Sequence, residues 1–555
     1  MKVRALFLLC IIFCFAIAPV QGFLITSFCP DTYLSGEDDE FFVISGTGSA
    51  EGLSVTDKEG TLYFPSGTML SGETNVARRA IAFYSVHGKN PDFELFDTDP
   101  KVPEILRRGN FRMANTADEL ITHLPDGTVI EVSWPEIVTP REGQVHYFSE
   151  KIWDPRPLII GQSDFDSWWV DNVSGTVFVS PDCSSEVLKS TIDEAQKELL
   201  INVYTFTGAG IASLVNERAL TGVQTTILLE GGPVGGISSE EKAVVSYLTT
   251  NGSLVYAMQS TDQAHARYRY DHAKYLCVDN TSVLVTSENF GDHGFPPEGE
   301  SGNRGWGVRL DNQEITSYFR TVFEEDNKGG DIISLSFSDV EAEPISSDAE
   351  FVPTFAPLPF SDAQVRPVLA PENSFLIPAT INTAKTSIVI EQAYIKNWSS
   401  GTNPYLEAAI NASRRGVDVR ILLDATYYNL EGDQDNDEMV EYINRVATAE
   451  ILPLQARMVR FEAEDPIKIH NKGMIIDTET VLIGSINWNE NSPLFNREVA
   501  VLLRHPGVGA YFTKVFDYDW NAGRSMIPPG PDGVKIAVGC GVIVLLSLLY
   551  LMRRR

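Results

Sequence analysis

One short pattern of histidine, lysine and aspartate occurs twice in this chain, 198 residues apart. The first copy is His272-Ala-Lys274-Tyr-Leu-Cys-Val-Asp279 and the second is His470-Asn-Lys472-Gly-Met-Ile-Ile-Asp477. A serine follows each histidine after fifteen residues and an asparagine two residues later, as Ser287 with Asn289 and Ser485 with Asn487. A repeat of this length and order predicts a chain built from two equivalent halves.

The spacing within each copy predicts one polar surface. Both copies lie in apolar runs rich in β-branched residues, which are typical of strands. Side chains at positions i and i+2 of a strand share a face, so His272 lies with Lys274, and His470 with Lys472. The next predicted strand of each half ends in the serine and asparagine. Each half therefore offers one imidazole, one ammonium and one amide.

This set of groups suits a phosphodiester substrate. Lysine and asparagine can stabilise the non-bridging oxygens as negative charge develops around phosphorus. One neutral imidazole can attack phosphorus, while the other, protonated, can donate its proton to the leaving oxygen. Because the reaction needs two imidazoles, one half is expected to be half of a site.

The duplicated H-x-K-x4-D pattern, each followed by G/T-S-x-N, resembles the phospholipase D superfamily over about residues 182 to 523. The resemblance implies a covalent phosphohistidine intermediate, with His272 as the nucleophile and His470 as the general acid. It also implies catalysis without a metal or other cofactor, in a monomer that carries both half-sites. Asp279 and Asp477 are expected to tie their strands to a neighbouring turn.

The two halves differ at a second carboxylate. The second half continues Asn496-Arg-Glu498, where members of the superfamily carry a carboxylate that orients an active-site imidazole, whereas the first half has Asn303-Arg-Gly305. Glu288, Asp292, Glu298 and Glu300 are candidates to replace the missing carboxylate, and the pairing can cross between halves. Loss of such a partner weakens an acid or base without necessarily abolishing it. An inactive, phosphate-binding or structural relative therefore remains an alternative.

The chain around both motifs alternates helices with strands. Residues 185–197 and 375–385 read as helices that lead into the strands 199–204 and 387–394, and a second helix and strand follow in each half. We therefore expect an α/β fold of two pseudo-symmetric phospholipase D-type sandwich halves, 182–343 and 372–523, with the site at their seam. The proline-rich segment 344–371 is expected to be a linker between them.

Residues 23–134 differ in texture, with short alternating runs separated by Gly, Ser, Thr and Asp. This pattern is typical of a small immunoglobulin-like β-sandwich. Segments such as Glu40-Phe-Phe-Val-Ile-Ser and Leu124-Pro-Asp-Gly-Thr-Val resemble a lamin-tail domain, which implies an accessory module without chemistry of its own. Residues 135–181 are expected to link it to the catalytic region.

Both ends of the chain are apolar. Residues 1–22 have the basic start, apolar middle and small-residue exit of a secretory signal peptide. After a stalk at 524–535, residues 536–552 are uncharged and span roughly 26 Å as a helix, and three arginines follow at 553–555. We expect a single-pass cell-membrane protein with an extracellular bulk and a cytoplasmic C-terminus, since positive residues stay inside. A processed sorting or lipid-anchor signal is the alternative for the tail.

The charge of the chain limits the class of substrate. With 75 acidic and 43 basic residues, the formal net charge is −32. This balance disfavours a general nucleic-acid binder, so an anionic substrate must be drawn by local cations, for which Lys274, Lys472, Arg304 and Arg497 are candidates. The alternative for the two arginines is pairing with surface carboxylates. Three functions remain, in this order: phospholipid hydrolysis or phosphatidyl transfer, extracellular nuclease, and inactive surface binding protein.

Of the three cysteines outside the terminal segments, Cys277 is expected to pack as a small hydrophobe, and a Cys29–Cys183 bridge is left open.

Overall fold

The computed structural model describes residues 22–34, 36–149, 151–261, 264–338, 351–432, 435–461 and 466–522. The predicted signal peptide, apart from Gly22, and the predicted stalk, transmembrane segment and tail lie outside these residues. Within the described ranges, no helix is both long and apolar enough to cross a membrane. The chain divides after Ile160 into two compact units, described separately below.

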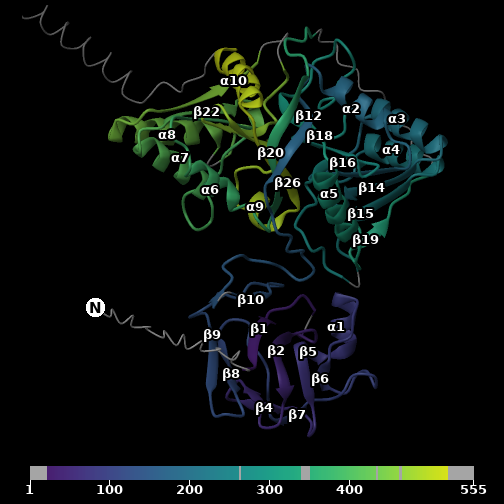
Figure 1. Cartoon of the computed structure of the whole chain (residues 1–555), viewed down its shortest axis with the longest axis vertical. Coiled ribbons are helices and arrows are strands. Elements are labelled where there is room, and N and C mark those ends of the chain that lie inside the picture. Colours follow the sequence, from purple (N-terminus) through teal and green to yellow (C-terminus); the bar gives the residue numbers. More distant parts are fainter. Residues whose placement is uncertain are drawn as a thin grey trace, which may run out of the picture. The chain divides into compact units, whose positions relative to one another are not determined.

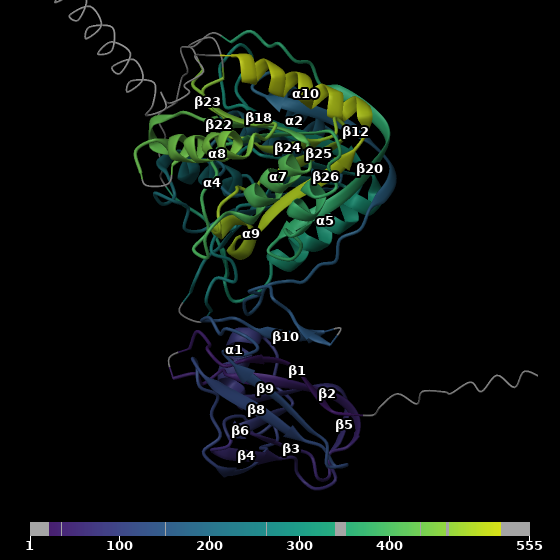
Figure 2. The same cartoon turned by 90° about the vertical axis from the view of Figure 1, so that its left-hand side faces the viewer.

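The described part of the first unit consists of two β-sheets and the helix α1 (Figures 1 and 2). One sheet has the order β11-β10-β1-β2-β5-β6 and the other β7-β4-β3-β8-β9. Their strands are β1 (Leu24–Cys29), β2 (Phe41–Ser49), β3 (Ser54–Thr56), β4 (Gly60–Tyr63), β5 (Met69–Arg79), β6 (Phe93–Phe96), β7 (Leu106–Gly109), β8 (Asp118–His123), β9 (Val129–Trp134), β10 (His146–Ser149) and β11 (Ile152–Trp153), with helix α1 (Ala80–His87) after β5. Both sheets contribute to one apolar core, in which Phe28 of β1 stacks on Trp134 of β9 at 5.0 Å.

The boundary predicted for this unit was too early. Residues 135–160 were expected to be linker, but β10 and β11 extend the sheet of β1 by antiparallel pairing. Val145 and Ile160 are buried in a small core with Cys29 and Phe41. The sandwich therefore ends near residue 160, because these short strands cover an edge that would otherwise be open.

The second unit holds one 15-stranded sheet flanked by helices. The first half contains β12 (Val170–Ser180), α2 (Ser184–Asp193), β13 (Glu198–Val203), α3 (Ala209–Leu220), β14 (Gln224–Glu230), α4 (Ser239–Thr250), β15 (Leu254–Met258), β16 (Lys274–Val278), β17 (Ser282–Thr286), β18 (Gly305–Asp311), α5 (Gln313–Asp326) and β19 (Ile332–Ser334). The second half contains β20 (Leu358–Ala370), α6 (Leu376–Ile381), β21 (Ser387–Gln392), α7 (Pro404–Arg414), β22 (Asp418–Asp424), the 3-10 helix η1 (Tyr427–Asn429), α8 (Asn436–Glu450), β23 (Leu454–Val459), β24 (Lys472–Ile476), β25 (Thr480–Gly484), α9 (Asn491–Phe495), β26 (Glu498–Arg504) and α10 (Pro506–Asn521).

The strand order displays the internal duplication. It runs β19-β15-β14-β13-β16-β17-β18-β12 in the first half and continues β20-β26-β25-β24-β21-β22-β23 in the second. Apart from β19, the second series reads as the first in reverse, and the antiparallel pair β12–β20 joins the two. In Figure 1 the helices α3, α4 and α5 lie to one side of this central pair and α6, α7 and α8 to the other. The predicted two-half α/β fold is confirmed.

Two predicted linkers are instead the central strands of this sheet. The segment 135–181 contains β12, and the proline-rich segment 344–371 contains β20. The prolines misled the prediction because proline cannot donate a ladder hydrogen bond and so suggests a loop. The β12–β20 ladder is irregular, with register shifts around Val173 and a φ of 59° at Asp362, and such a strand accommodates proline.

Local sequence explains several helix starts. Asn403 caps α7 by accepting the N–H groups of Tyr405 and Leu406, and Pro404 occupies the first turn. Ser238 and Asn312 cap α4 and α5 in the same way. These side chains satisfy N–H groups that have no partner within the helix. Each of these helices thus begins at a fixed point after its strand.

Candidate active site

Both motif histidines lie just before a central strand, and each bonds to the other half. His272 precedes β16, and its backbone N–H donates to the carbonyl of Arg497 at 2.8 Å. His470 precedes β24, and its N–H donates to the carbonyl of Arg304 at 2.9 Å. The histidines were expected to lie within these strands, but the strands begin two residues later, at Lys274 and Lys472. The exchange of backbone hydrogen bonds brings the two half-sites to the seam.

Glu498 serves the histidine of the opposite half. It begins β26 of the second half, and its Oε2 lies 2.8 Å from Nδ1 of His272. Asn496 donates from Nδ2 to the other oxygen of Glu498 at 3.0 Å, and Ser492 donates its hydroxyl at 2.5 Å. An ionised carboxylate only accepts hydrogen bonds, so Nδ1 of His272 carries the proton and Nε2 has the free lone pair.

Glu288 provides the carboxylate that the first half lacks at Gly305. Both of its oxygens lie 3.1 Å from Nδ1 of His470, and Nδ2 of Asn303 donates to it at 3.0 Å. A Cβ atom at Gly305 would lie 2.1 Å from Oε1 of Glu288, so the glycine makes room for this carboxylate. Of the four candidates from sequence, Glu288 is the one that bonds to His470. The pairing crosses between halves for both histidines.

The two carboxylates are held in their ionised form. Burial by itself opposes ionisation, but the neighbouring His470, Lys472 and Asn303 outweigh it and lower the pKa of Glu288 to about 2. Burial also opposes ionisation of Glu498, yet His272 and Lys274 bring its pKa below the usual value. Each carboxylate therefore remains an acceptor for Nδ1 at neutral pH.

The imidazoles are neutral in the site as it stands. Burial lowers the pKa of His272 to about 4, against the raising effect of Glu498. Burial likewise lowers the pKa of His470 to about 3, against the effect of Glu288. A neutral His272 is ready to act as a nucleophile. A general acid must be protonated, and the negative charge of a bound phosphate would raise the pKa of His470 toward that state.

The two lysines lie beneath the histidines. Lys274 donates to the carbonyl of His272 at 2.9 Å, and Lys472 donates to the carbonyl of His470. Burial lowers the pKa of Lys274 to about 8 and that of Lys472 to about 7. The proximity of the two ammonium groups contributes to the lower value for Lys472. Two neighbouring cations provide a place for an anion.

The serines and asparagines lie just beyond the strands in which they were predicted. Ser287 accepts the N–H of Trp306, and Ser485 accepts that of Val499, so both serines tie adjacent strands together. The Oδ1 atoms of Asn289 and Asn487 are buried and make no hydrogen bond in this structure. An amide oxygen only accepts hydrogen bonds, so these two atoms could meet a ligand's donor, whereas the serines already have backbone partners.

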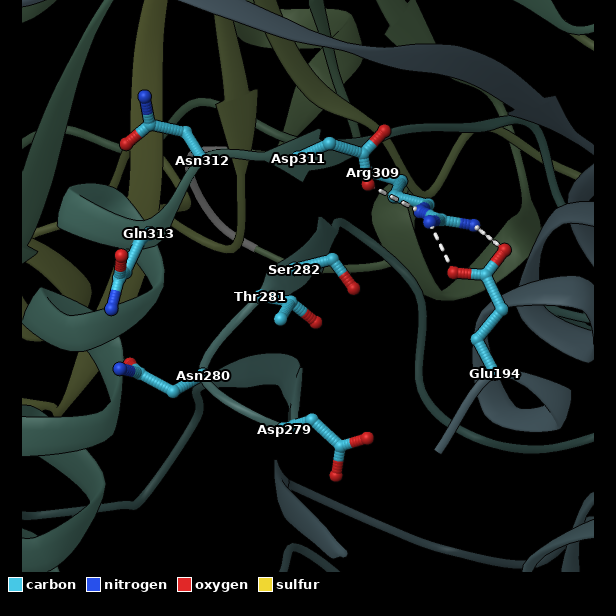
Figure 3. A pocket seen from close by; sticks show the side chains of 9 residues that line it. All are labelled: Glu194, Asp279, Asn280, Thr281, Ser282, Arg309, Asp311, Asn312 and Gln313. Carbon is cyan, nitrogen blue, oxygen red and sulfur yellow. Dashed lines mark hydrogen bonds and ion pairs between the residues drawn. The ribbon is translucent and has the colours of Figure 1, made fainter. Parts of the chain in front are cut away.

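Asp279 and Asp477 lie at the far ends of β16 and β24. Asp279 accepts backbone N–H groups of residues 196–198, and Asp477 those of residues 385–387, consistent with the structural role expected for them. Asp279 also lines a cavity of about 500 Å³ with Asn280 and Arg309 (Figure 3). Arg309 is paired there with Glu194 and Asp311, so its charge is already neutralised. This cavity contains none of the histidines.

Arg304 and Arg497 do not face a substrate. Both are fully buried, and each is paired with two buried carboxylates. Arg304 binds Asp182 and Asp519, and Arg497 binds Glu372 and Asp326. Their sequence interpretation as candidate substrate cations was wrong, because exposure cannot be read from a motif. Asp519 and Asp326 come from α10 and α5 of the opposite half in each case, so these pairs fasten the halves together.

Two tyrosines near the histidines were missed from sequence. The ring of Tyr204 lies 4.8 Å from that of His272, edge to face, and 5.4 Å from Nζ of Lys274. Tyr394 lies after β21, one position beyond the counterpart of Tyr204, with its hydroxyl bonded to Asn489 and its ring 6.0 Å from Nζ of Lys396. No motif marks either tyrosine in the sequence.

The described part of the chain contains no cluster of three or more His, Cys, Asp or Glu side chains suited to a metal ion. The cysteines Cys29, Cys183 and Cys277 are buried free thiols. Burial raises the pKa of Cys277 well above its usual value. This thiol packs in the strand of the first motif as an apolar group.

A family model described as "Cardiolipin synthase, PLD-like domain" matches residues 188–327 and 377–520, which is just over half of the chain. The chain belongs to the phospholipase D-like family. The two matched segments coincide with the two halves of the second unit, and each contains one complete copy of the motif.

Proteins similar to this chain are named for different activities. Cardiolipin synthase A of Yersinia pseudotuberculosis is 28% identical over 124 residues, which cover 21% of this chain and 23% of that protein. The phosphatidylserine synthase of Haemophilus influenzae covers 69% of this chain and 96% of its own, at 10% identity and a TM-score of 0.49. Nuc of Salmonella typhimurium, a phospholipase D family member, covers 31% and 100%, at 19% identity and a TM-score of 0.25. The match to the curated relatives spans about a quarter of their length.

Proposed function

We propose that this protein is a phosphodiesterase of phospholipase D type that hydrolyses phospholipids or transfers phosphatidyl groups. The observation that carries the proposal is the crossed pairing of two imidazoles with two buried carboxylates. Glu498 holds His272 and Glu288 holds His470, each through Nδ1. Both rings therefore leave Nε2 free to react, that of His272 as the nucleophile and that of His470 as the general acid.

The reaction follows from these groups. Nε2 of His272 attacks phosphorus, the bond from phosphorus to the leaving oxygen breaks, and His470 donates a proton to that oxygen. Lys274, Lys472, Asn289 and Asn487 stabilise the non-bridging oxygens of the pentacoordinate state. Water, or an alcohol in a transfer, then gives its proton to the neutral His470 and attacks phosphorus. The phosphorus–nitrogen bond breaks and His272 is restored.

The rim of the site favours a lipid. Val234, in the loop after β14, is 80% exposed, and its backbone N–H donates to the hydroxyl of Tyr204 at 2.7 Å. In the other half, the exposed side chains of Tyr427 and Tyr428 follow β22, and Nζ of Lys468 lies 5.2 Å from the ring of Tyr428. Apolar side chains on both sides of the histidines suit acyl chains, with a lysine placed for a head-group phosphate.

An extracellular nuclease is the second candidate. Exposed tyrosines beside a lysine, such as Tyr427, Tyr428 and Lys468, can also stack bases next to a phosphate. The formal net charge of −32 works against this function, because nucleic-acid binding relies on an excess of cations. An inactive surface binding protein is less well supported, since Glu288 occupies the place of the carboxylate missing at Gly305.

Export and membrane anchoring remain part of this proposal. The terminal segments of the sequence support a cell-membrane protein whose bulk is extracellular, and the two-sheet first unit supports a lamin-tail-like accessory module. Protease added to intact cells should then digest nearly the whole chain. Full protection of the bulk would place it inside the cell and contradict the localisation.

The function is tested with the full-length protein in detergent micelles. We expect turnover of labelled phosphatidylcholine or cardiolipin, unchanged by excess EDTA, and little or no cleavage of single-stranded or duplex DNA. Cleavage of DNA alone would favour the nuclease. Complete loss of activity in EDTA that zinc or magnesium restores would overturn the mechanism, because the histidines and lysines are proposed to act without a cation.

A further inference from the structure

A buried carboxylate lies directly behind the His272 segment at the end of β14. Glu230 accepts the N–H of Asp271, the residue just before His272, with its Oε2 at 2.6 Å. Its Oε1 accepts the N–H of Gly232 at 2.7 Å, in the loop that carries Val234. One side chain thus joins the histidine segment to a loop at the rim of the site.

The second half repeats this device with a shorter side chain. Asp424 ends β22, and its Oδ1 accepts the N–H of Ile469, just before His470, at 3.0 Å. Its Oδ2 accepts the N–H of Thr426 at 3.0 Å and the amide of Asn429 at 2.8 Å. This oxygen therefore holds the start of the loop with Tyr427 and Tyr428.

The repetition carries information because burial of a carboxylate is unfavourable. Glu230 is 6% exposed and Asp424 1% exposed. Burial raises the pKa of Glu230 to about 7, against the lowering effect of its two backbone donors. Strand pairing alone would be served by an apolar side chain at less cost. Both halves nonetheless place a carboxylate at the same point, with different residues and the same two kinds of partner.

We propose that Glu230 and Asp424 are positioning residues for the two catalytic histidines. Each fixes the backbone immediately before its histidine, so that Nε2 stays where phosphorus or the leaving oxygen will lie. Neither side chain needs to contact the substrate. The inference rests on the proposed function, which gives His272 and His470 their roles.

Replacement by the isosteric amide breaks this arrangement. Both oxygens of each carboxylate accept backbone N–H groups, but an amide has one oxygen and one NH2 group. In Glu230→Gln or Asp424→Asn, one backbone N–H must therefore face another donor. The histidine segment then shifts, and a displacement of about 1 Å in an active site can slow catalysis about 100-fold.

The kinetic test uses two leaving groups. Glu230→Gln should lower kcat about 10- to 100-fold on both phosphatidylcholine and a p-nitrophenyl phosphodiester, because it displaces the nucleophile. Asp424→Asn should lower kcat to a similar degree on phosphatidylcholine but spare the first-turnover burst of p-nitrophenol, since p-nitrophenol departs with little protonation. KM should change much less than kcat. Loss of the p-nitrophenol burst in both variants would contradict the separate roles.

A second measurement does not depend on activity. Diethyl pyrocarbonate modifies neutral imidazoles, and mass spectrometry follows the rate at each histidine. We expect a faster reaction of His272 in Glu230→Gln and of His470 in Asp424→Asn, with the other histidine unchanged. Wild-type rates at both histidines in both variants would overturn the proposal. If wild-type protein cleaves no phosphodiester but the modification pattern holds, the proposed function fails and the positioning role stands.

Glu94 in the first unit provides a matched control. It is fully buried, and its oxygens accept backbone N–H groups of Ala80 on one side and of Thr98 and Asp99 on the other. Glu94→Gln makes the same chemical change away from the histidines. It should leave kcat and both modification rates as in the wild type. Matching losses in Glu94→Gln and Glu230→Gln would show that any buried amide lowers activity through folding.

Discussion

The two halves of the catalytic unit reach the same arrangement by different residues. In the second half, the orienting carboxylate is Glu498 at the start of β26, and in the first half it is Glu288 after β17. In the other half, the position that corresponds to Glu498 is Gly305, and the one that corresponds to Glu288 is Ile486. Each half thus has its carboxylate where the other half has none. Both carboxylates nevertheless reach Nδ1 of the opposite histidine.

The difference shows that the orienting carboxylate must lie at one place beside the imidazole, whereas the position in the chain that provides it can change. A carboxylate from either strand can reach the imidazole, provided that the neighbouring position leaves room. Gly305 leaves that room, because any Cβ atom there would overlap Glu288. The first half therefore has a relocated orienting group, and it is not a degenerate copy of the second.

The largest effect should come from the histidines, whose roles differ between halves. His272→Ala should remove turnover by more than about 10⁴-fold and abolish any phosphoenzyme, since no nucleophile remains. His470→Ala should still release a burst of p-nitrophenol from an activated diester, because that leaving group needs little protonation.

Quenched-flow release of nitrophenol distinguishes these outcomes. A burst in His272→Ala but not in His470→Ala would exchange the two roles. Wild-type activity in both variants would mean that the duplicated motif is not the active site.

Substitution of the two buried arginines should test whether both ion-pair clusters contribute equally to the stability of the contact between the halves. Replacing one partner of a buried ion pair leaves an uncompensated charge, which costs about 3–5 kcal/mol of unfolding free energy. Arg304→Met and Arg497→Met should both reach this range. Arg497→Met should cost more, because Arg497 also binds the hydroxyls of Tyr268 and Ser163.

Urea denaturation of the purified protein measures both values. Arg309→Met is a suitable control, since its guanidinium pairs with carboxylates that are exposed. A cost near zero for Arg304→Met or Arg497→Met would show that the halves are held mainly by their shared sheet.

Substitution of the orienting carboxylates should have a smaller effect on kcat, and a carboxylate at the alternative position should restore part of it. Glu498→Gln and Glu288→Gln should each lower kcat about 10- to 100-fold, because the imidazole loses its fixed tautomer and orientation. Gly305→Glu alone should be harmful, since the new side chain meets Glu288. In the Glu288→Ala background, the same Gly305→Glu change should recover part of the lost activity by restoring the arrangement of the second half.

Steady-state kinetics of the four variants and the double variant measure this coupling. Additive losses in the double variant would show that the two positions are not equivalent in space.

The smallest effect should appear in the pH profile. Since the pKa of His272 is lowered to about 4, kcat/KM for an activated diester should rise as pH increases through about 4, where the nucleophile loses its proton. Since the pKa of Lys472 is lowered to about 7 and that of Lys274 to about 8, kcat/KM should fall as pH rises through about 7. Lys472→Arg should move the upper limb to about 8.

Glu498→Gln sharpens the comparison further, because Glu498 raises the pKa of His272. Its removal should shift the lower limb to a more acidic pH. A lower limb near 6.5, the ordinary value for histidine, would contradict the burial of His272.

The sequence by itself determined the duplication, the two-half α/β fold and the identity of the histidines and lysines. These features could be predicted because they are local: a motif of eight residues and the alternation of apolar runs are present in the chain before it folds. The sequence also predicted that Asp279 and Asp477 would tie strands to turns, consistent with their hydrogen bonds to backbone N–H groups.

Only the tertiary structure decided which carboxylate serves which histidine. Glu498 and His272 are 226 residues apart, and Glu288 and His470 are 182 apart, so no local pattern links them. The same reason explains why β12 and β20 were mistaken for linkers and why Arg304 and Arg497 were taken for substrate cations. Burial and pairing across the seam depend on contacts between distant segments, and those contacts exist only once the two halves share one sheet.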